Sequence, residues 1–364
     1  METEAPLSLP ALTYPYPRRI HPDTDQAEEA MLSWLGGHGL IRQPAVLEAF
    51  RYTRFAGMIG HQYPDADSDG LRVVSEFCGW IFIMDDYVCD SGVFGRRVGD
   101  LAVFCAWMRD ILENPGQGGH DPLGDAATSG VDSAGRDFCF RIARAAAECF
   151  EMIAARATPA QYMRFVSEMD YYFHGVMWEA RHHAAGTVPT PEEYRIGRRM
   201  TCGAPFALAL QDIAAGYEVP ANEYQHPEVR ALRLMTANIN SWCDDIFSYG
   251  KESEVQEATP LNLPLTLIHH RGLGEQAALD ETARLHNAEV DRYLTAEAHT
   301  AMWAGEQLTR LLAAMRTMQR GFYDWGLETP RYNVGHYFRD LPDAAGDTSL
   351  TPEGRPVGAA GREP

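Results

Sequence analysis

The sequence lacks the signals of a secreted, disulfide-bonded or zinc-binding protein. Its seven cysteines are odd in number and scattered, and they form no CxxC pair. This pattern argues against a disulfide framework or a zinc site and favours a reducing, cytoplasmic location. No uninterrupted apolar segment is long enough to cross a membrane, and the N-terminus has no basic start followed by an apolar core. We therefore expect a cytosolic protein without a membrane anchor.

Basic residues are also few. The chain carries 31 Lys and Arg against 51 Asp and Glu, a formal charge of −20, which repels nucleic-acid phosphates and anionic lipid surfaces. We therefore expect no nucleic-acid partner. With 364 residues and 45% hydrophobic content, the chain is nevertheless long enough to bury a large core.

Strand-like alternation and hairpin turns are scarce, whereas apolar residues recur at helical spacing along most of the chain. We predict one all-α domain over residues 23–342. The ends, 1–22 and 343–364, are rich in Pro, Gly and Ala, which indicates flexible tails. The Gly-rich stretch 114–130 lacks apolar periodicity, so we expect an exposed loop. A phosphate-binding loop is not expected, because no strand precedes this stretch. The predicted helices are 44–62, 70–90, 97–113, 133–155, 159–184, 190–216, 226–252, 275–297 and 298–325.

A first acidic cluster follows a run of bulky apolar residues in "WIFIMDDYVCD". Apolar side chains recur at three- and four-residue spacing from Phe77 to Met84 and mark one buried face of a helix that runs into Asp85 and Asp86. Asp85 projects closer to this apolar face than Asp86 does. Because the negative end of a helix disfavours anions, the placement indicates a function such as metal binding. A solvated acidic helix end is the alternative.

A second acidic cluster lies in "NSWCDDIFSYGKE". Asp244, Ser248 and Glu252 recur at intervals of four, so their oxygen atoms form a ladder on one helix face. Oxygen ligands suit a hard cation such as Mg²⁺, which is usually completed by water and substrate phosphates. Lys251 returns to the same face and could bind phosphate. The alternative is a polar helix face in which Lys251 offsets the repulsion between carboxylates.

The two clusters together resemble the motifs of bacterial class I terpene synthases, and the resemblance covers residues 22–332. "YPDADSDGLRVVSEFCGWIFIMDDYVCD" is similar to the family's approach to its aspartate-rich motif, and "CDDIFSYGKE" is similar to its Asn/Asp-Ser-Glu triad. The resemblance implies an all-α bundle around a deep central cavity and three Mg²⁺ ions, for which Mn²⁺ could substitute, around a prenyl diphosphate. The metal ligands that it implies are Asp85, Asp86, Asp244, Ser248 and Glu252.

This sequence departs from the family pattern at two positions. Asp244 stands where Asn is more frequent, which keeps an oxygen ligand and adds charge. The third acid of the first motif, Asp90, comes one place later than in DDxxD. We therefore expect Asp90 not to bind metal directly but to lie behind the residues that do. Asp86 is expected either to bind metal or to accept hydrogen bonds from an arginine.

Two further segments match the family in order and spacing. In "EEYRIGRRMTCGAPFALAL", the resemblance assigns Arg198 as the diphosphate sensor. Thr201 and Cys202 then fall at the helix break that couples diphosphate binding to ionisation. Arg199 with Gly203 is the alternative assignment, shifted by one residue. In "ETPRYN", the resemblance assigns diphosphate binding to the pair Arg331 and Tyr332.

A carbocation needs an inert pocket whose aromatic faces stabilise positive charge. Each aromatic residue near the motifs could equally be ordinary core. The candidates for the pocket lining are Phe55, Phe77, Trp80, Phe82, Phe206 and Trp325.

The resemblance implies a Mg²⁺-dependent lyase of the EC 4.2.3 type that cyclises farnesyl diphosphate to a sesquiterpene hydrocarbon or alcohol, as a monomer or homodimer. A diterpene cyclase acting on geranylgeranyl diphosphate is the main alternative. A chain-elongating prenyl diphosphate synthase would normally carry a second DDxxD in place of the Ser-Glu triad. A non-catalytic helical scaffold is the alternative of a different class.

Overall fold

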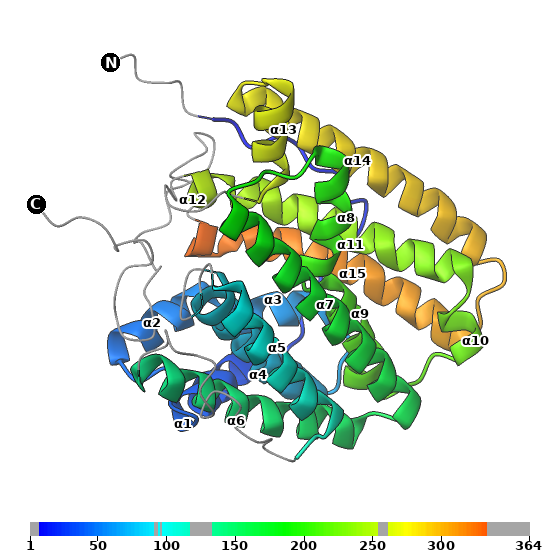
Figure 1. Ribbon diagram of the computed structural model, residues 1–364. Coiled ribbons are helices and arrows are strands. Elements are labelled where there is room, and N and C mark those ends of the chain that lie inside the picture. The colour runs from blue at the N-terminus through cyan, green and yellow to red at the C-terminus, as the bar shows by residue number, and fades with distance from the viewer. Residues whose placement is uncertain (1–6, 91–93, 95–96, 117–132, 254–260, 333–364) are drawn as a thin grey trace, which may run out of the picture.

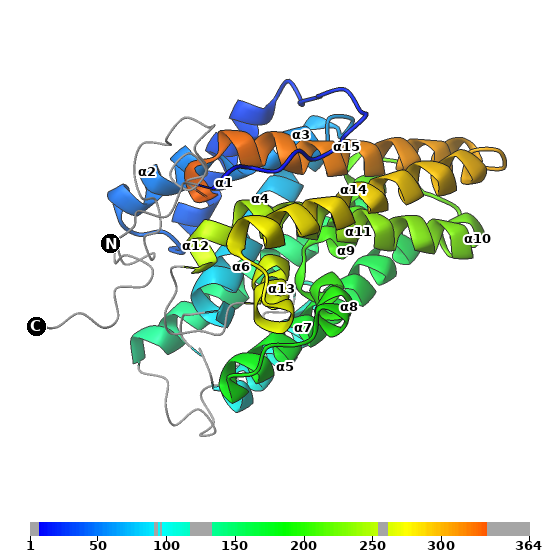
Figure 2. The ribbon, with the colours of Figure 1, turned by 90° about the horizontal axis from the view of Figure 1, so that it is seen from above.

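The computed structural model describes residues 7–90, 94, 97–116, 133–253 and 261–332. The expected tail 343–364 and most of the expected loop, 117–130, lie outside these residues. Every element in the described part of the chain is a helix, as predicted (Figures 1 and 2). The α-helices are α1 Thr24–Gly37, α2 Pro44–Thr53, α3 Phe55–Gln62, α4 Ser68–Met84, α5 Val98–Glu113, α6 Ser133–Arg156, α7 Pro159–Ala185, α8 Pro191–Thr201, α9 Ala204–Ala214, α10 Ala221–Tyr224, α11 Pro227–Phe247, α12 Tyr249–Ser253, α13 Leu263–Arg271, α14 Glu275–Thr300 and α15 Glu306–Glu328. A π-helix, η1, spans Asp85–Asp90, and a 3₁₀ turn, η2, spans Pro330–Tyr332.

Local sequence signals fix where several of these helices begin. Thr158 and Gln161 form a capping box at the start of α7, and Thr190 and Glu193 form another at the start of α8. In each case the side chain and the backbone of the two residues exchange hydrogen bonds, which satisfies N–H groups that a helix start leaves unpaired. A proline at the first position of each helix also fixes the backbone φ near its helical value.

Three predicted helices are interrupted in the structure. At Arg54 the backbone is left-handed, with φ at 54°, which ends α2 and starts α3. The backbone of Cys202 is extended, and Pro205 follows in the first turn of α9. Proline is tolerated there because N–H groups of the first turn have no hydrogen-bond partner within the helix. The third interruption lies at Ser248, between α11 and α12. These breaks divide the predicted ranges 44–62, 190–216 and 226–252.

The first acidic motif lies on a widened helix turn. The predicted helix 70–90 is α-helical to Met84 and becomes the π-helix η1 from Asp85 onward. π-Helical turns are rare and occur frequently at functional sites. The side chain of Asp90 lies outside the description, so its expected outer position stays a prediction.

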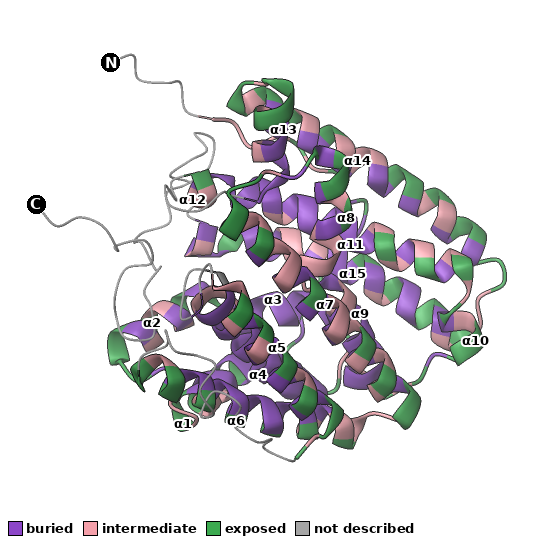
Figure 3. Ribbon diagram, in the orientation of Figure 1, coloured by how far each residue is buried: buried purple, intermediate pink, exposed green. Residues whose placement is uncertain are grey.

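The helices close into a ring around a central cavity. Neighbours in this ring pack in the order α3, α4, η1, α7, α8, α11 and α15, and α15 packs back against α3. Figure 3 shows that the helix surfaces turned towards the interior are largely buried, whereas the outer surfaces are exposed. This arrangement places the two acidic motifs, at the ends of α4 and α11, on different walls of the same cavity.

Residues 7–22, whose composition predicts a flexible segment, pack against the helical bundle. Tyr14 and Tyr16 are buried, and the Tyr14 hydroxyl lies 2.8 Å from Nε2 of His286 on α14. Arg320 on α15 donates a hydrogen bond of 3.1 Å to the carbonyl oxygen of Tyr16. The two tyrosine rings supply the apolar area that holds this segment on the bundle. Within the described residues, no helix is long and apolar enough to span a membrane.

Candidate active site

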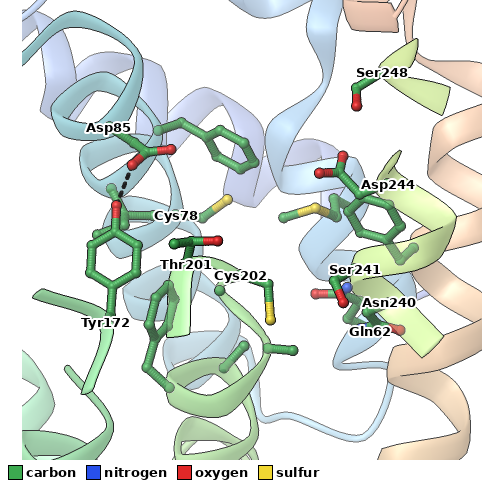
Figure 4. Close-up of a pocket in the computed structure, with 18 of the residues that line it drawn as sticks. Gln62, Cys78, Asp85, Tyr172, Thr201, Cys202, Asn240, Ser241, Asp244 and Ser248 are labelled. Carbon is green, nitrogen blue, oxygen red and sulfur yellow. Dashed lines mark hydrogen bonds between the residues drawn. The ribbon is translucent and has the colours of Figure 1, made fainter. Parts of the chain in front are cut away.

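The central cavity has an acidic end and an apolar interior. It contains about 1310 Å³ of empty space, including its opening to solvent. Figure 4 shows Asp85 on one wall, and Asp244 and Ser248 on the wall across from it. The predicted residues that line the cavity are Asp85, Asp86, Arg198, Thr201, Cys202, Gly203, Asp244, Ser248, Lys251, Glu252, Arg331 and Tyr332.

The first wall holds its two adjacent aspartates in different ways. The hydroxyl of Tyr172 on α7 donates to Oδ1 of Asp85, and Arg331 binds both oxygens of Asp86 at 2.8 Å. Burial raises the pKa of Asp85 to about 6, although the Tyr172 hydrogen bond opposes the shift. Burial would also raise the pKa of Asp86, but Arg331 and Lys251 outweigh it, so this pKa is lowered. Asp86 is therefore firmly ionised, whereas Asp85 titrates near neutrality.

The second wall carries Asp244, Asp245 and Glu252. Asp244 accepts hydrogen bonds from Arg198 at 2.5 Å and from the Tyr332 hydroxyl at 2.7 Å. Burial raises the pKa of Glu252 to about 7, and repulsion from Asp244 and Asp245 adds to the shift. A neighbouring cation would lower this pKa and bind the ionised carboxylate.

The consecutive residues Arg331 and Tyr332 connect the two walls. Arg331 binds Asp86 of the first wall, while Tyr332 binds Asp244 of the second. Both side chains belong to the short turn η2, which follows α15. The turn therefore spans the acidic end of the cavity.

Arg198 and Arg199 point to different surroundings. Arg198 lines the cavity, where its Nε donates to Asp245 at 2.9 Å and its guanidinium also binds Asp244. The Arg199 Nε instead donates to Oδ1 of Asn238 at 2.8 Å, and Arg199 does not line the cavity. Of the two arginines that the sequence left open, Arg198 is the one in position to contact a ligand.

The helix break after Arg198 also faces the cavity. Thr201 lies 3.3 Å from the Arg198 guanidinium, and the extended backbone at Cys202 ends α8. Gly203 packs closely, because an added Cβ would come within 2.9 Å of the Phe206 ring. Burial raises the pKa of the Cys202 thiol to about 11, so it stays protonated and uncharged at neutral pH.

The six aromatic candidates divide into two sets. Phe77, Phe82 and Phe206 line the cavity, whereas Phe55, Trp80 and Trp325 do not. Trp80 donates its ring N–H to the Ile142 carbonyl oxygen, and Trp325 donates to those of Thr53 and Arg54. Phe55 packs 4.4 Å from the Phe82 ring, centroid to centroid. The assignment of these three residues to the pocket is wrong, because all three belong to the core around it.

Comparison with known proteins agrees with this geometry. Residues 76–292 match the family model described as terpene synthase family 2, C-terminal metal binding. The chain belongs to this family. It is a bacterial class I terpene synthase, as the motifs suggested.

Relatives of this terpene synthase match it along nearly its whole length. A 4-epi-cubebol synthase from Streptosporangium roseum, whose name specifies cyclisation of (2E,6E)-farnesyl diphosphate, is 26% identical over 90% of this chain and 93% of its own. A germacrene A synthase from Nostoc punctiforme is 26% identical over 90% of this chain and 96% of its own. The crystal structure of the SVS_A2 protein, from ancestral sequence reconstruction, superposes with a TM-score of 0.75 at 26% identity, covering 94% of this terpene synthase and 93% of that chain.

Several polar residues of the site were not predicted from the sequence, and Tyr172, Glu179 and Asp245 are those at its acidic end. Tyr172 and Glu179 lie about two turns apart on α7 and both line the cavity. Burial raises the pKa of Glu179 to about 8, with Asp85 adding repulsion. Asp245 lies behind Asp244 and receives hydrogen bonds from Arg198 and Tyr194. Tyr172 and Glu179 lie seven residues apart on an otherwise apolar face of α7, and this spacing is the signal that could have identified them from the sequence.

The residues of the two walls fit a hard divalent cation. Asp85, Asp244, Ser248 and Glu252 offer only oxygen atoms to the cavity, which is the donor set that Mg²⁺ prefers. Among the described residues, no three acidic, His or Cys side chains converge into a complete metal site. Each wall alone would therefore supply only part of a coordination sphere, which water and diphosphate oxygens would complete.

Proposed function

We propose that this terpene synthase is a Mg²⁺-dependent cyclase that ionises farnesyl diphosphate and cyclises the resulting carbocation to a sesquiterpene, releasing diphosphate. The observation that carries the proposal is the pair of acidic walls at one end of a mostly apolar cavity. Asp85, Asp244, Ser248 and Glu252 would hold the metal. Three Mg²⁺ ions are expected, and Mn²⁺ could replace them.

The cationic residues of the cavity would bind the diphosphate. Arg198, Lys251 and Arg331 line the same end of the cavity as the carboxylates, and Tyr332 supplies a hydroxyl donor. Bound Mg²⁺ would supply further positive charge that stabilises the leaving diphosphate. Because Arg198 and Arg331 are paired with Asp244 and Asp86 in the structure, they would share or exchange these partners when diphosphate binds.

The interior of the cavity suits a hydrocarbon cation. The Phe77 and Phe206 rings line it and meet edge to face at 5.4 Å between centroids, and aromatic faces attract positive charge. The break at Cys202 and Gly203 borders the same space, beside Arg198. It would couple the binding of diphosphate to the start of the reaction, and closure of the two walls would exclude solvent.

Incubation with geranyl, farnesyl and geranylgeranyl diphosphates, each with Mg²⁺, tests the proposal. We expect diphosphate release and cyclic C15 products from farnesyl diphosphate. Cyclic C20 products alone would instead identify a diterpene cyclase. A longer prenyl diphosphate formed after addition of isopentenyl diphosphate would identify a chain-elongating synthase, and absence of turnover with all three would contradict the proposal.

A further inference from the structure

Two buried side-chain amides lie in the wall of the cavity that would hold the hydrocarbon. Gln62 ends α3 and is 3% exposed, and Asn240 lies on α11 and is 5% exposed. Both line the cavity. Because α15 packs against α3 and against α11, the two amides come to the same side. Figure 4 shows them with Ser241 below Asp244, across from Thr201 and Cys202.

Neither amide has a hydrogen-bond partner among the described residues. Oδ1 of Asn240 is fully occluded and unpaired. The backbone carbonyl of Gln62 accepts hydrogen bonds from Gln211 and Thr317, which fixes the position of the residue, but its side-chain amide has no such contact. Ser241 differs, since its hydroxyl donates to the Ala237 carbonyl oxygen at 2.7 Å within the same helix.

Unpaired amides are costly in an apolar wall, and a hydrocarbon substrate cannot satisfy them. Buried polar groups of this kind are generally paired with water, which needs two to four polar partners. The Gln62 amide offers N–H donors and a carbonyl acceptor, and Nδ2 of Asn240 offers further N–H donors, whereas its Oδ1 is occluded. Met58, Ile59 and Met318, which line the same cavity, are apolar, so the two amides and Ser241 form a polar spot beside apolar side chains.

We infer that Gln62 and Asn240 hold a water molecule that captures the final carbocation, so that the principal product is a terpene alcohol rather than a hydrocarbon. This inference rests on the proposed cyclase activity. A lone pair of the water oxygen forms a C–O bond with the cationic carbon, and the resulting oxonium ion loses one proton. Neutral amides are too weakly basic to keep this proton, and the released diphosphate anion at the acidic end of the cavity is the acceptor.

Turnover of farnesyl diphosphate in ¹⁸O-labelled water tests the inference on the unmodified protein. We expect an alcohol product whose mass increases by that of one ¹⁸O atom. Diphosphate release with only hydrocarbon products, or with an alcohol that retains ¹⁶O, would overturn the inference while leaving the cyclase activity intact. No diphosphate release from any prenyl diphosphate would instead be a failure of the proposed function itself.

Apolar variants of similar size test the assignment to these residues. In Gln62→Leu and Asn240→Leu, made separately, we expect the ratio of alcohol to hydrocarbon to fall about tenfold, because the water loses a partner. Ser241→Ala is the matched control on the same wall and should leave the ratio within about twofold, because that hydroxyl is already paired within its helix.

Product ratios are internal to each reaction and are unaffected by partial loss of folded protein. Because the two variants alter different helices, either one alone suffices if the other does not fold. An unchanged ratio in a folded variant, or an equal fall in Ser241→Ala, would overturn the assignment.

Discussion

The two acidic walls of the cavity balance their charge differently. On the first wall, Asp86 is paired with Arg331 at 2.8 Å through both oxygens, and Asp85 accepts from a tyrosine. The second wall gathers Asp244, Asp245 and Glu252 around the guanidinium of Arg198, and Lys251 lines the same end of the cavity. The comparison teaches that Arg331 serves a single carboxylate, Asp86, whereas Arg198 is shared by two carboxylates, Asp244 and Asp245, on the second wall. We therefore expect the second wall to contribute more to metal binding than the first.

The largest effect on activity is expected from a substitution in the second wall. Asp244→Ala should lower kcat/KM about a thousandfold, since removal of a preorganised contact to developing charge costs roughly 3–4 kcal/mol. Asp244→Asn keeps an oxygen ligand and should stay within about tenfold of the unmodified protein. Diphosphate release across a Mg²⁺ titration measures both. Equal losses in the two variants would show that the side-chain oxygen is not the important feature.

The adjacent arginines provide the next test, because only one of them supports the second wall. Arg198→Ala should lower kcat/KM about a hundredfold, through loss of contacts to diphosphate. Arg199→Ala should change it less than about threefold, since its partner Asn238 lies outside the cavity. Steady-state kinetics under saturating Mg²⁺ distinguish them. A larger loss in Arg199→Ala would reverse our assignment of the diphosphate sensor.

On the first wall, we expect a smaller difference in Mg²⁺ dependence between variants of the adjacent residues Asp85 and Asp86. Asp85→Asn should raise the Mg²⁺ concentration for half-maximal activity about tenfold, because Asp85 is held by the Tyr172 hydroxyl and by no arginine among the described residues, which leaves its second oxygen for metal. Asp86→Asn should raise it only about threefold, since Asp86 serves chiefly to hold Arg331. The titration midpoint for each variant is the measurement. A greater shift in Asp86→Asn would make Asp86 the principal ligand of this wall.

The last effect concerns the pH dependence of stability. The pKa of Glu252 is about 7 in the folded, metal-free protein and about 4.3 in an unfolded chain. The folded state therefore binds more protons between these values, and the free energy of unfolding should fall as pH rises from about 5 to 7, by less than about 1.4 kcal/mol per pH unit for this one group.

Urea unfolding at several pH values, with and without Mg²⁺, measures this dependence. Bound cation should reduce it by favouring the ionised carboxylate, and Glu252→Gln should remove the contribution of this group. A stability that rises with pH to the same extent in the unmodified protein and in Glu252→Gln would contradict the raised pKa.

Much of the fold and of the acidic end of the cavity could be predicted from residue spacing. Asp244, Ser248 and Glu252 recur at helical intervals, and they reach one cavity even though Ser248 interrupts the helix. The break at Arg54 could not be predicted, because a left-handed arginine carries no local signal comparable to glycine. Nor could the packing of Tyr14, which depends on a partner almost the whole chain away.

Burial also limits what a sequence can distinguish. Phe77 and Trp80 are one helical turn apart and both fully buried, yet only Phe77 lines the cavity. Apolar periodicity marks the face of a helix that avoids solvent, but it does not separate core from pocket. Gln62 and Asn240 were missed for a related reason, since an isolated amide belongs to no spacing pattern.

The most direct test of the two-walled site is a crystal structure of the protein with Mg²⁺ and diphosphate. We predict metal ions that contact Asp85 on the first wall and Asp244, Ser248 and Glu252 on the second, with Arg198, Lys251 and Arg331 on the diphosphate. Diphosphate bound without metal at Asp244, Ser248 and Glu252, or metal bound away from both walls, would contradict the account.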